Sequence, residues 1–362
     1  MHENKTILVT GGAGFIGSAF VRKASIEARV IVLDAMTYAG DESRLLDSDQ
    51  SVTLIKGDIC NEPLVTELMN EYRITSIVHF AAESHVDRSI DGPQVFLKTN
   101  VEGTMTLLRC ATTYWQQLSG PAKETFRFLH ISTDEVYGSL GFEDLPFTER
   151  SPYLPNSPYA ASKAASDHFV RAWFKTFKLP TLITHCSNNY GPWQFPEKLI
   201  PLMISKCLKE EPLPVYGDGS NIRDWIHVDD HVSALRLILD KAEPGSVWSI
   251  GGEAEVSNLD MVKEICKALD KKCPRPTSQS YQDLITFVQD RPGHDVRYAI
   301  DMTKLKTLLG WTPSVTFEEG LDQTIDWYLD AKNWREEVSQ KGAYHQSRLG
   351  IVSSQERQTR KA

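Results

Sequence analysis

The stretch TILVTGGAGFIGSAF, residues 6–20, decides the fold, because a short apolar run there meets a group of closely spaced glycines. The apolar run predicts a buried strand, and the amphipathic residues that follow it predict a helix. Gly11, Gly14 and Gly17 lie in the turn between the two. Glycine permits a tight turn and lets the backbone approach a pyrophosphate at the N-terminus of the helix. The stretch therefore predicts a dinucleotide site.

The same alternation of apolar run and amphipathic stretch continues through the first half of the chain. It predicts βαβ units and hence an α/β fold with a Rossmann-type, doubly wound parallel sheet. The further predicted strands are rich in Val, Ile, Leu and Thr, and they lie at residues 29–34, 52–58, 76–82, 127–133 and 181–186.

The second half of the chain predicts a smaller C-terminal lobe that interleaves with the sheet. Proline-rich connections begin at Pro192, and the run 246–252 is expected to return to the sheet. Helical patterns follow at 258–269 and 320–331. We expect an NAD-binding Rossmann domain at 1–190, to which 222–255 returns. The substrate lobe is expected at 191–221 and 256–345, and a disordered tail at 346–362.

Composition narrows the class of protein. The 362 residues carry a formal net charge of -9, which argues against nucleic acid or an anionic membrane as the main partner. The six cysteines form no CxxC pair, which suits a reducing compartment. We find no signal-peptide pattern and no apolar run near the ~20 residues that span a bilayer, and we expect a cytoplasmic protein.

Acidic and small residues at the ends of the predicted strands extend the dinucleotide site. Asp34 ends the second strand, twenty residues after Gly14, where a carboxylate binds the hydroxyls of the adenosine ribose. It should repel a 2'-phosphate, so NAD is favoured over NADP. The ends of the third and fourth strands, where open α/β sheets place ligands, carry Asp58-Ile59 and Ala81-Ala82.

The segment SPYAASKAASDHF carries Tyr159 and Lys163, four residues apart on one face of a predicted helix. A free phenol titrates near pH ~10 and is rarely ionised at neutral pH. A lysine cation ~4 Å away stabilises the phenolate by about 4 kcal/mol at an effective dielectric constant of ~20. We therefore expect Tyr159 to act as a base with a lowered pKa.

Two adjacent carboxylates, Asp134 and Glu135, follow the predicted strand 127–133 in the segment STDEVYG. Neighbouring carboxyl groups in a desolvated pocket cannot both ionise cheaply, so one of them should stay protonated. An acid and a base are then available side by side. Both can face one ligand only if the strand ends here and the chain turns, and Gly138 is consistent with such a turn.

With these motifs in place, the sequence resembles the nucleotide-sugar branch of the extended short-chain dehydrogenase/reductase family. The resemblance covers nearly the whole chain except the extreme tail. It is carried by TGGAGFIG, STDEVYG, Tyr159-x-x-x-Lys163, FAAESHVDRSIDGP, CSNNYGP, FPEKLIP, LPVYGDGSNIRDWIHVDDH and DRPGHDVRYAID.

The resemblance implies an NAD-dependent hydro-lyase that carries out 4,6-dehydration of glucose on a nucleoside diphosphate, with thymine as the base, at the start of deoxyhexose synthesis. Thr133, Tyr159 and Lys163 would serve oxidation at C4. Glu135 would then remove the C5 proton while Asp134 protonates the leaving C6 hydroxyl. Hydride would return to C6, so tightly bound NAD would be regenerated in each turnover.

The resemblance also implies two sets of ligand-binding residues, and the guanidinium forks of the two arginines suit the diphosphate. The cofactor set is Gly11, Gly14, Phe15, Ile16, Gly17, Asp34, Thr37, Asp58, Ile59, Ala81, Ala82, Thr99, Tyr159, Lys163 and Asn189. The substrate set is Ser84, His85, Thr133, Asn188, Lys198, Leu199, Pro214, Val215, Tyr216, Arg223, Asn258, Asp290, Arg291, His294 and Tyr298.

Other interpretations stay open. A nucleotide-sugar 4-epimerase, another dehydratase or a decarboxylase of the same family would share the Tyr/Lys pair, and a non-catalytic NAD-binding regulator would share the fold. The HVDDH segment, 227–231, has histidines at metal-ligand spacing. We expect no metal there, because Asp229 or Asp230 can instead cap the helix that follows. A homodimer through helices at 104–115 and 160–173 is expected from the family.

Overall fold

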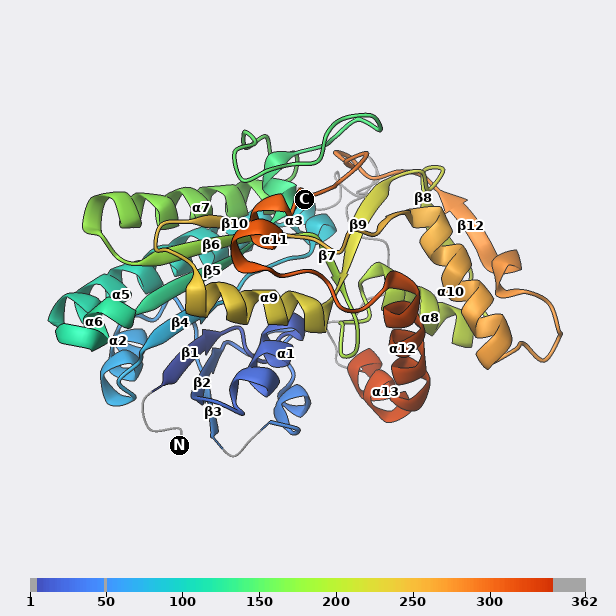
Figure 1. Ribbon diagram of the computed structural model, residues 1–362. Helices are drawn as coiled ribbons and strands as arrows, with labels where there is room; N and C mark the ends of the chain where they lie inside the picture. Colours follow the sequence, from blue (N-terminus) through green and yellow to red (C-terminus); the bar gives the residue numbers. More distant parts are fainter. Residues whose placement is uncertain (1–4, 49–50, 341–362) are drawn as a thin grey trace, which may run out of the picture.

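The centre of the protein is a seven-stranded parallel sheet (Figure 1). The structure is a computed structural model and describes residues 5–48 and 51–340. The predicted disordered tail, 346–362, lies outside the described residues. The strands of the sheet are β1 (Thr6–Thr10), β2 (Arg29–Asp34), β3 (Val52–Lys56), β4 (Ser76–His79), β5 (Arg127–Thr133), β6 (Thr181–Cys186) and β10 (Val247–Ile250).

The strand order β10-β6-β5-β4-β1-β2-β3 confirms the predicted doubly wound sheet. All neighbouring pairs are parallel. The order reverses between β1 and β4, and ligands bind at such a switch point, beyond the carboxyl ends of the strands. The run 246–252 does return to the sheet, since β10 pairs with β6.

Helices cover both faces of this sheet, and each face has its own apolar core (Figure 1). One face is covered by α1 (Phe15–Ala24), α9 (Val228–Lys241) and α11 (Thr303–Leu309). The other is covered by α2 (Glu62–Glu71), α5 (Thr104–Gln117) and α7 (Pro158–Phe177). Shorter elements connect them: η1 (Glu42–Leu45), α3 (Val86–Asp91), α4 (Pro93–Phe96), η2 (Leu97–Gly103), α6 (Gly120–Thr125) and η3 (Asp134–Tyr137).

A second group of elements packs around a separate core beside the carboxyl ends of the strands (Figure 1). Its strands form a three-stranded sheet and a parallel pair: β11 (Glu255–Ser257), β9 (Ile222–His227) and β7 (Asn188–Tyr190), then β12 (Ile285–Val288) and β8 (Leu213–Tyr216). Its helices are α8 (Leu199–Leu208), α10 (Asn258–Lys272), η4 (Tyr281–Leu284), α12 (Phe317–Asp330) and α13 (Lys332–Gln340). The domain boundaries proposed from sequence stay a prediction.

The HVDDH segment forms the start of α9 in a different way from the expected one. His227 is the N-cap, and its side chain accepts a hydrogen bond from the backbone N–H of Asp229. Asp230 instead accepts hydrogen bonds from the backbone of Ser314 and Val315. The prediction that Asp229 or Asp230 caps a helix is therefore wrong, because the helix begins earlier in the chain. Among the residues that the structure describes, no three His, Cys, Asp or Glu side chains are grouped to hold a metal ion.

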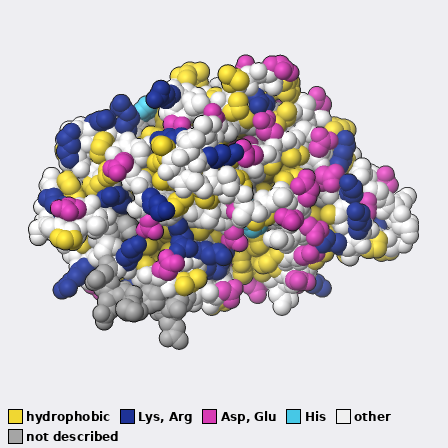
Figure 2. Space-filling view, viewed as in Figure 1, with side chains coloured by type: hydrophobic (Ala, Val, Ile, Leu, Met, Phe, Trp, Pro, Cys, Tyr) yellow, Lys and Arg dark blue, Asp and Glu magenta, His cyan; other side chains and the backbone are white. Residues whose placement is uncertain are grey.

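The surface carries both signs of charge. On the face seen in Figure 2, basic and acidic side chains lie interspersed among apolar and uncharged ones. Within the described ranges, no helix is long and apolar enough to cross a membrane.

Candidate active site

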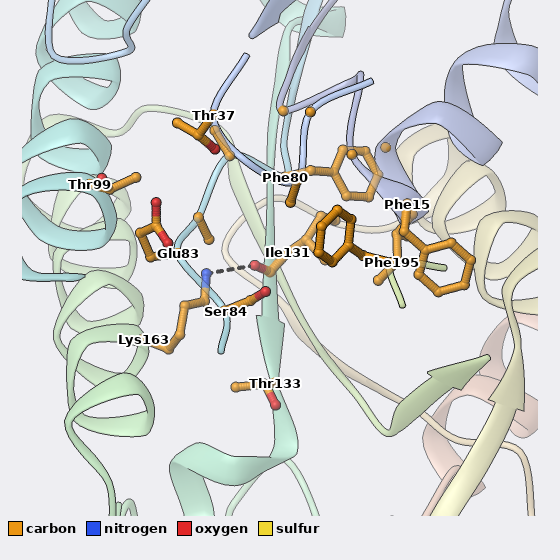
Figure 3. A pocket seen from close by; sticks show the side chains of 18 of the residues that line it. Phe15, Thr37, Phe80, Glu83, Ser84, Thr99, Ile131, Thr133, Lys163 and Phe195 are labelled. Atoms are coloured by element: carbon orange, nitrogen blue, oxygen red, sulfur yellow. Dashed lines mark hydrogen bonds between the residues drawn. The ribbon is translucent and has the colours of Figure 1, made fainter. Parts of the chain in front are cut away.

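A cavity of about 480 Å³ opens at the carboxyl ends of the central strands, at the switch point of the sheet. Figure 3 shows its wall, with side chains converging from the strand ends and from α7. Every residue of the predicted cofactor set lines this cavity. Five sequence-distant turns, which follow β1 to β5, meet there because parallel strands end at the same edge of the sheet.

The glycine turn after β1 packs closely against the protein's own backbone, which only residues without a Cβ allow. Gly11 has a φ of +70°, and a Cβ placed there would lie 2.6 Å from the backbone nitrogen of Ala81. A Cβ on Gly17 would lie 2.3 Å from the carbonyl oxygen of Gly11. Helix α1 begins at Phe15, so its free N–H groups face the same space. This arrangement fits the pyrophosphate of a dinucleotide.

Asp34 is held in place by the backbone around it. Its Oδ2 accepts a hydrogen bond from the N–H of Ala13 at 2.9 Å, and its Oδ1 accepts one from Met36 at 2.8 Å. Burial raises the pKa of this carboxyl group, and the two hydrogen bonds oppose that rise. Each carboxylate oxygen can accept a further bond. Ribose hydroxyls fit such acceptors, and a phosphate does not.

Lys163 and Tyr159 lie on the buried side of α7, whose first turn is capped by Ser157. Lys163 Nζ donates a hydrogen bond to the carbonyl oxygen of Ile131 in β5 at 2.8 Å (Figure 3). Both side chains line the cavity, so the structure brings the predicted pair to the predicted cofactor site.

The expectation of a lowered pKa for Tyr159 is wrong for the protein alone. The pKa of the phenol lies well above its ordinary value, first because the group is buried and then because of the charge on Glu135. A hydrogen bond with Thr133 opposes the rise. Burial also lowers the pKa of Lys163. The positive charge of an oxidised nicotinamide would act on the phenol in the expected direction.

Asp134 and Glu135 both reach the cavity because β5 ends immediately before them. The chain turns into η3 at Asp134, and Gly138 follows with a φ of +88°. Thr133 is the N-cap of this turn, and its hydroxyl accepts a hydrogen bond from the N–H of Glu135 at 3.3 Å. The turn that two adjacent acids require is therefore present.

The two carboxyl groups differ in their electrostatic surroundings. Burial, together with the charges of Glu135 and Asp224, raises the pKa of Asp134 well above its ordinary value. Burial also raises the pKa of Glu135, but Arg291, Arg223 and Lys198 oppose this rise. Asp134 is thus the carboxyl group suited to stay protonated, and Glu135 the one suited to ionise.

The three cations near Glu135 are each held by a partner. Arg223 donates to the carbonyl oxygen of Asp295 at 2.9 Å, and its guanidinium carbon lies 4.3 Å from the ring centroid of Tyr298. Arg291 donates to Asp87 Oδ1 at 3.0 Å. Lys198 Nζ donates to the carbonyl oxygen of Ser84 at 3.1 Å. Positive charge is therefore concentrated next to the acid pair although the protein as a whole is acidic.

The predicted substrate set divides into two groups. Four of its members line the cavity: Ser84, Thr133, Asn188 and Lys198. The others lie outside the cavity wall, where β8, β9 and the 290–298 segment meet α3 and η3: His85, Leu199, Pro214, Val215, Tyr216, Arg223, Asn258, Asp290, Arg291, His294 and Tyr298. Within this second group, Tyr216 donates to Asp87 Oδ2 at 3.1 Å and His294 lies 2.7 Å from Asp290. Their roles stay predictions.

Several residues of the cavity wall were not predicted, among them Glu83, Lys98, Gln194, Phe195, Glu197 and Arg44. Glu83 and Glu197 stand inside motifs that carry the family resemblance, and this position is a usable signal. Arg44 is almost wholly buried and donates to the carbonyl oxygen of Ala13 at 3.0 Å. Nothing in its local sequence distinguishes it from a surface arginine.

Comparison with known proteins agrees with this geometry. A family model described as GDP-mannose 4,6 dehydratase matches residues 8–324. A dTDP-glucose 4,6-dehydratase of Xanthomonas campestris pv. campestris is 53% identical over 350 residues, which cover 96% of this chain and 99% of the relative. dTDP-glucose 4,6-dehydratase 1 of Escherichia coli is 49% identical over 350 residues, which cover 93% of this chain and 96% of the relative.

Solved structures share the fold over most of the chain. The crystal structure of DesIV, a dTDP-glucose 4,6-dehydratase from Streptomyces venezuelae with NAD and TYD bound, has a TM-score of 0.83 and 44% identity, and the match covers 92% of this chain and 99% of that one. The UDP-glucose 4-epimerase of Thermotoga maritima with UDP-glucose has a TM-score of 0.80 and 27% identity, covering 90% and 99%.

Proposed function

The chain belongs to the family of nucleotide-sugar dehydratases within the extended short-chain dehydrogenases/reductases, and from this premise we propose that it converts dTDP-glucose into dTDP-4-keto-6-deoxyglucose and water. NAD is its cofactor. One observation supports the dehydration above all. Asp134 and Glu135 stand side by side at the cavity that Tyr159 and Lys163 also line, and more cations oppose the rise in pKa at Glu135 than at Asp134.

Bound NAD would supply the hydride acceptor for C4 of the sugar and the hydride donor for C6. Tyr159 takes the proton of the C4 hydroxyl, and the Thr133 hydroxyl, which contacts the phenol, orients that transfer. Lys163 supplies the nearby positive charge that favours the phenolate. An enzyme that only oxidised C4 would need no further groups. The adjacent carboxyl groups of Asp134 and Glu135 would have no role in such a reaction.

The acid pair carries the elimination. A ketone at C4 acidifies the hydrogen on C5, and Glu135, which three cations favour as a carboxylate, removes it. Asp134, which burial keeps protonated, donates its proton to the departing C6 hydroxyl. Water leaves, and the C5 proton is restored when hydride arrives at C6. A 4-epimerase does not need the second of these groups.

Substrate binding follows the distribution of positive charge. Arg223 and Arg291 bind the diphosphate through their guanidinium groups. Ser84 and Lys198 line the cavity, where Ser84 contacts the substrate and Lys198 lies toward its nucleotide end. The elements β8 and β12 then enclose the nucleoside. The preference for thymine comes from the relatives, whose printed names state dTDP-glucose.

The proposal extends to assembly and location. The protein forms a homodimer through α5 and α7, which leave Arg109, Ala161, His168 and Ala172 exposed along the two helices. Its six cysteines are free, as a cytoplasmic enzyme requires. The Rossmann domain binds NAD, and the lobe around α8, α10 and α12 binds the nucleotide sugar. Light scattering after size exclusion measures the dimer directly.

The test of the reaction is incubation of the purified protein with dTDP-glucose in D2O without added cofactor. We expect a 4-keto-6-deoxy product that carries deuterium at C5. Formation of dTDP-galactose, or recovery of unchanged substrate by a protein that holds NAD, would contradict the proposal. UDP- and GDP-glucose, assayed in parallel, measure the preference for thymine.

A Glu135→Gln variant separates the base from the redox step. It should retain NAD and still oxidise C4, but it should lose exchange of deuterium into C5. Glu143→Gln, which changes an exposed acid eight residues along the chain, is the matched control and should exchange as the unmodified protein does.

A further inference from the structure

Asp167 is a buried carboxylate that the proposed reaction does not use. It lies in α7, one helical turn after Lys163, and only 1% of its surface is exposed. It does not line the cavity. A charge in this position is costly unless the surrounding groups compensate for it, so the groups around it indicate its task.

Three donors from three segments converge on one oxygen of Asp167. The hydroxyl of Ser132 in β5 donates to Oδ2 at 2.9 Å, and the hydroxyl of Tyr153 donates at 3.1 Å. His185 Nε2, in β6, lies 2.9 Å from the same oxygen. His185 Nδ1 lies 2.8 Å from the hydroxyl of Tyr137, and with that hydroxyl as the donor to Nδ1 the ring carries its proton on Nε2, toward Asp167. Hydrogen bonds donated to a carboxylate favour its ionised form, so this arrangement favours a charged Asp167.

The other oxygen of Asp167 faces His130. His130 Nε2 lies 3.2 Å from Asp167 Oδ1 and 3.2 Å from the hydroxyl oxygen of Ser166. The hydroxyl of Ser166 donates its own proton to the carbonyl oxygen of Lys163 at 2.8 Å. Nε2 must therefore be the donor to Ser166, and the tautomer of His130 is the one with a proton on Nε2. This proton also faces the carboxylate.

Lys163 lies on the other side of the same ring nitrogen. Its Nζ is 3.5 Å from His130 Nε2 and donates to the carbonyl oxygen of Ile131. The nitrogen of a neutral imidazole thus separates a buried ammonium group from a buried carboxylate. Since Nε2 carries a proton, Lys163 cannot donate to it, and the Ile131 carbonyl oxygen fixes the ammonium group.

Asp167 is the first group that opposes the effect of burial on Lys163, because burial lowers the pKa of the ammonium group and the charge of Asp167 raises it. Burial and the charge of Lys163 lower the pKa of His130 to about 4, so this ring is neutral at pH 7. Burial lowers the pKa of His79, whose ring centroid lies 5.2 Å from that of His130. The titratable groups that face Lys163 and Asp167 are His130 and His79 from β5 and β4, His185 and Cys186 from β6, Tyr159 from α7, and Tyr137 and Tyr153.

We infer that Asp167 is a positioning residue for the reaction proposed above: held by Ser132, Tyr153, His185 and His130, it is the internal counter-ion that keeps Lys163 charged and directed at the cofactor cavity. The inference rests on the proposed function for its kinetic part alone. Without Asp167, burial of the ammonium group would be uncompensated, and Lys163 would lose its proton at a lower pH.

The kinetic test compares Asp167→Asn with Asp230→Asn. Both replace a buried carboxylate that accepts several hydrogen bonds, but Asp230 binds the Ser314–Val315 backbone. We expect the alkaline limb of the kcat profile to move down by about one pH unit in Asp167→Asn, because the charge that raises the pKa of Lys163 is removed. KM should change little, and Asp230→Asn should leave the limb in place. An unmoved limb in Asp167→Asn would overturn the inference.

A second measurement is independent of activity and of the variant's folding. Nitrogen-15 NMR of the histidines in the unmodified protein should show His130 neutral and protonated on Nε2 between pH 6 and 8, and His185 with a proton on Nε2. An unprotonated Nε2 on either ring would turn a lone pair toward the carboxylate of Asp167 and would overturn the inference. A protein that shows these tautomers but no dehydration would contradict the proposed reaction and leave the counter-ion role standing.

Discussion

The hydroxyl of Thr133 donates a hydrogen bond to Asp134 Oδ1 at 3.3 Å, while the other oxygen of that carboxyl group, Oδ2, has no partner among the described residues. A buried, unpaired oxygen suits a protonated acid that waits for a substrate hydroxyl. The same threonine oxygen contacts the phenol of Tyr159. One side chain therefore orients both the acid of the elimination and the base of the oxidation.

The first prediction concerns Asp134→Asn. The amide is similar in size but cannot donate a proton to the leaving hydroxyl, so kcat for dehydration should fall about 10²–10⁴-fold. Oxidation at C4 should continue, and reduced cofactor should accumulate after substrate is added. Absorbance spectra and product analysis measure both effects. Asp144→Asn, at an exposed loop position, is the control, and equal losses in the two variants would contradict the role of Asp134.

The second prediction concerns Arg223→Lys. Lysine keeps the charge but loses the planar fork that matches phosphate oxygens, and it also loses the stacking on Tyr298. KM for the nucleotide sugar should rise about tenfold or more, with NAD retained. Arg236→Lys, in an ion pair with Glu27 at the surface, should leave KM unchanged. Loss of NAD from Arg223→Lys would indicate that Arg223 binds the cofactor and not the nucleotide sugar, and would contradict this prediction.

The third prediction concerns Gly17→Ala. The new Cβ would lie 2.3 Å from the Gly11 carbonyl oxygen, so the glycine turn would have to move. Bound NAD should be lost on gel filtration, and the free energy of unfolding should fall by about 2 kcal/mol or more. Gly310→Ala is the matched control, because its φ is +68° but a Cβ there meets nothing within 4 Å. It should cost about 1 kcal/mol and retain NAD.

The fourth prediction concerns acid stability. Burial lowers the pKa of His231 to about 3, so the folded protein binds this proton less readily than the unfolded chain does. The stabilisation by the neutral ring is complete above pH ~6.5 and is lost as the pH falls from there toward 3, at about 1.4 kcal/mol per pH unit. In His231→Gln, the slope of the unfolding free energy against pH between pH 6.5 and 5 should be smaller by about 1.4 kcal/mol per pH unit.

The sequence determined the parts of this protein that depend on neighbours along the chain. The pattern of apolar residues along the chain predicted the strands of the central sheet, because each buried parallel strand must be a short continuous apolar run. The glycines after β1, Asp34 after β2 and the acids after β5 were found because strand ends share one edge of a parallel sheet. The turn at Asp134 followed from the same reasoning, since adjacent side chains on a strand cannot face one ligand.

Only the tertiary structure decided the properties that depend on burial and on distant partners. The spacing of Tyr159 and Lys163 predicted a lowered pKa for the phenol, but burial and the charge on Glu135 raise it. The N-cap of α9 is His227 and not one of the aspartates. Asp230 instead accepts a hydrogen bond from Ser314, 84 residues further along the chain. The donors to Asp167 come from two strands and a loop, so no local pattern predicts them. Electrostatic free energies are set by desolvation and by distance in space, and sequence separation specifies neither.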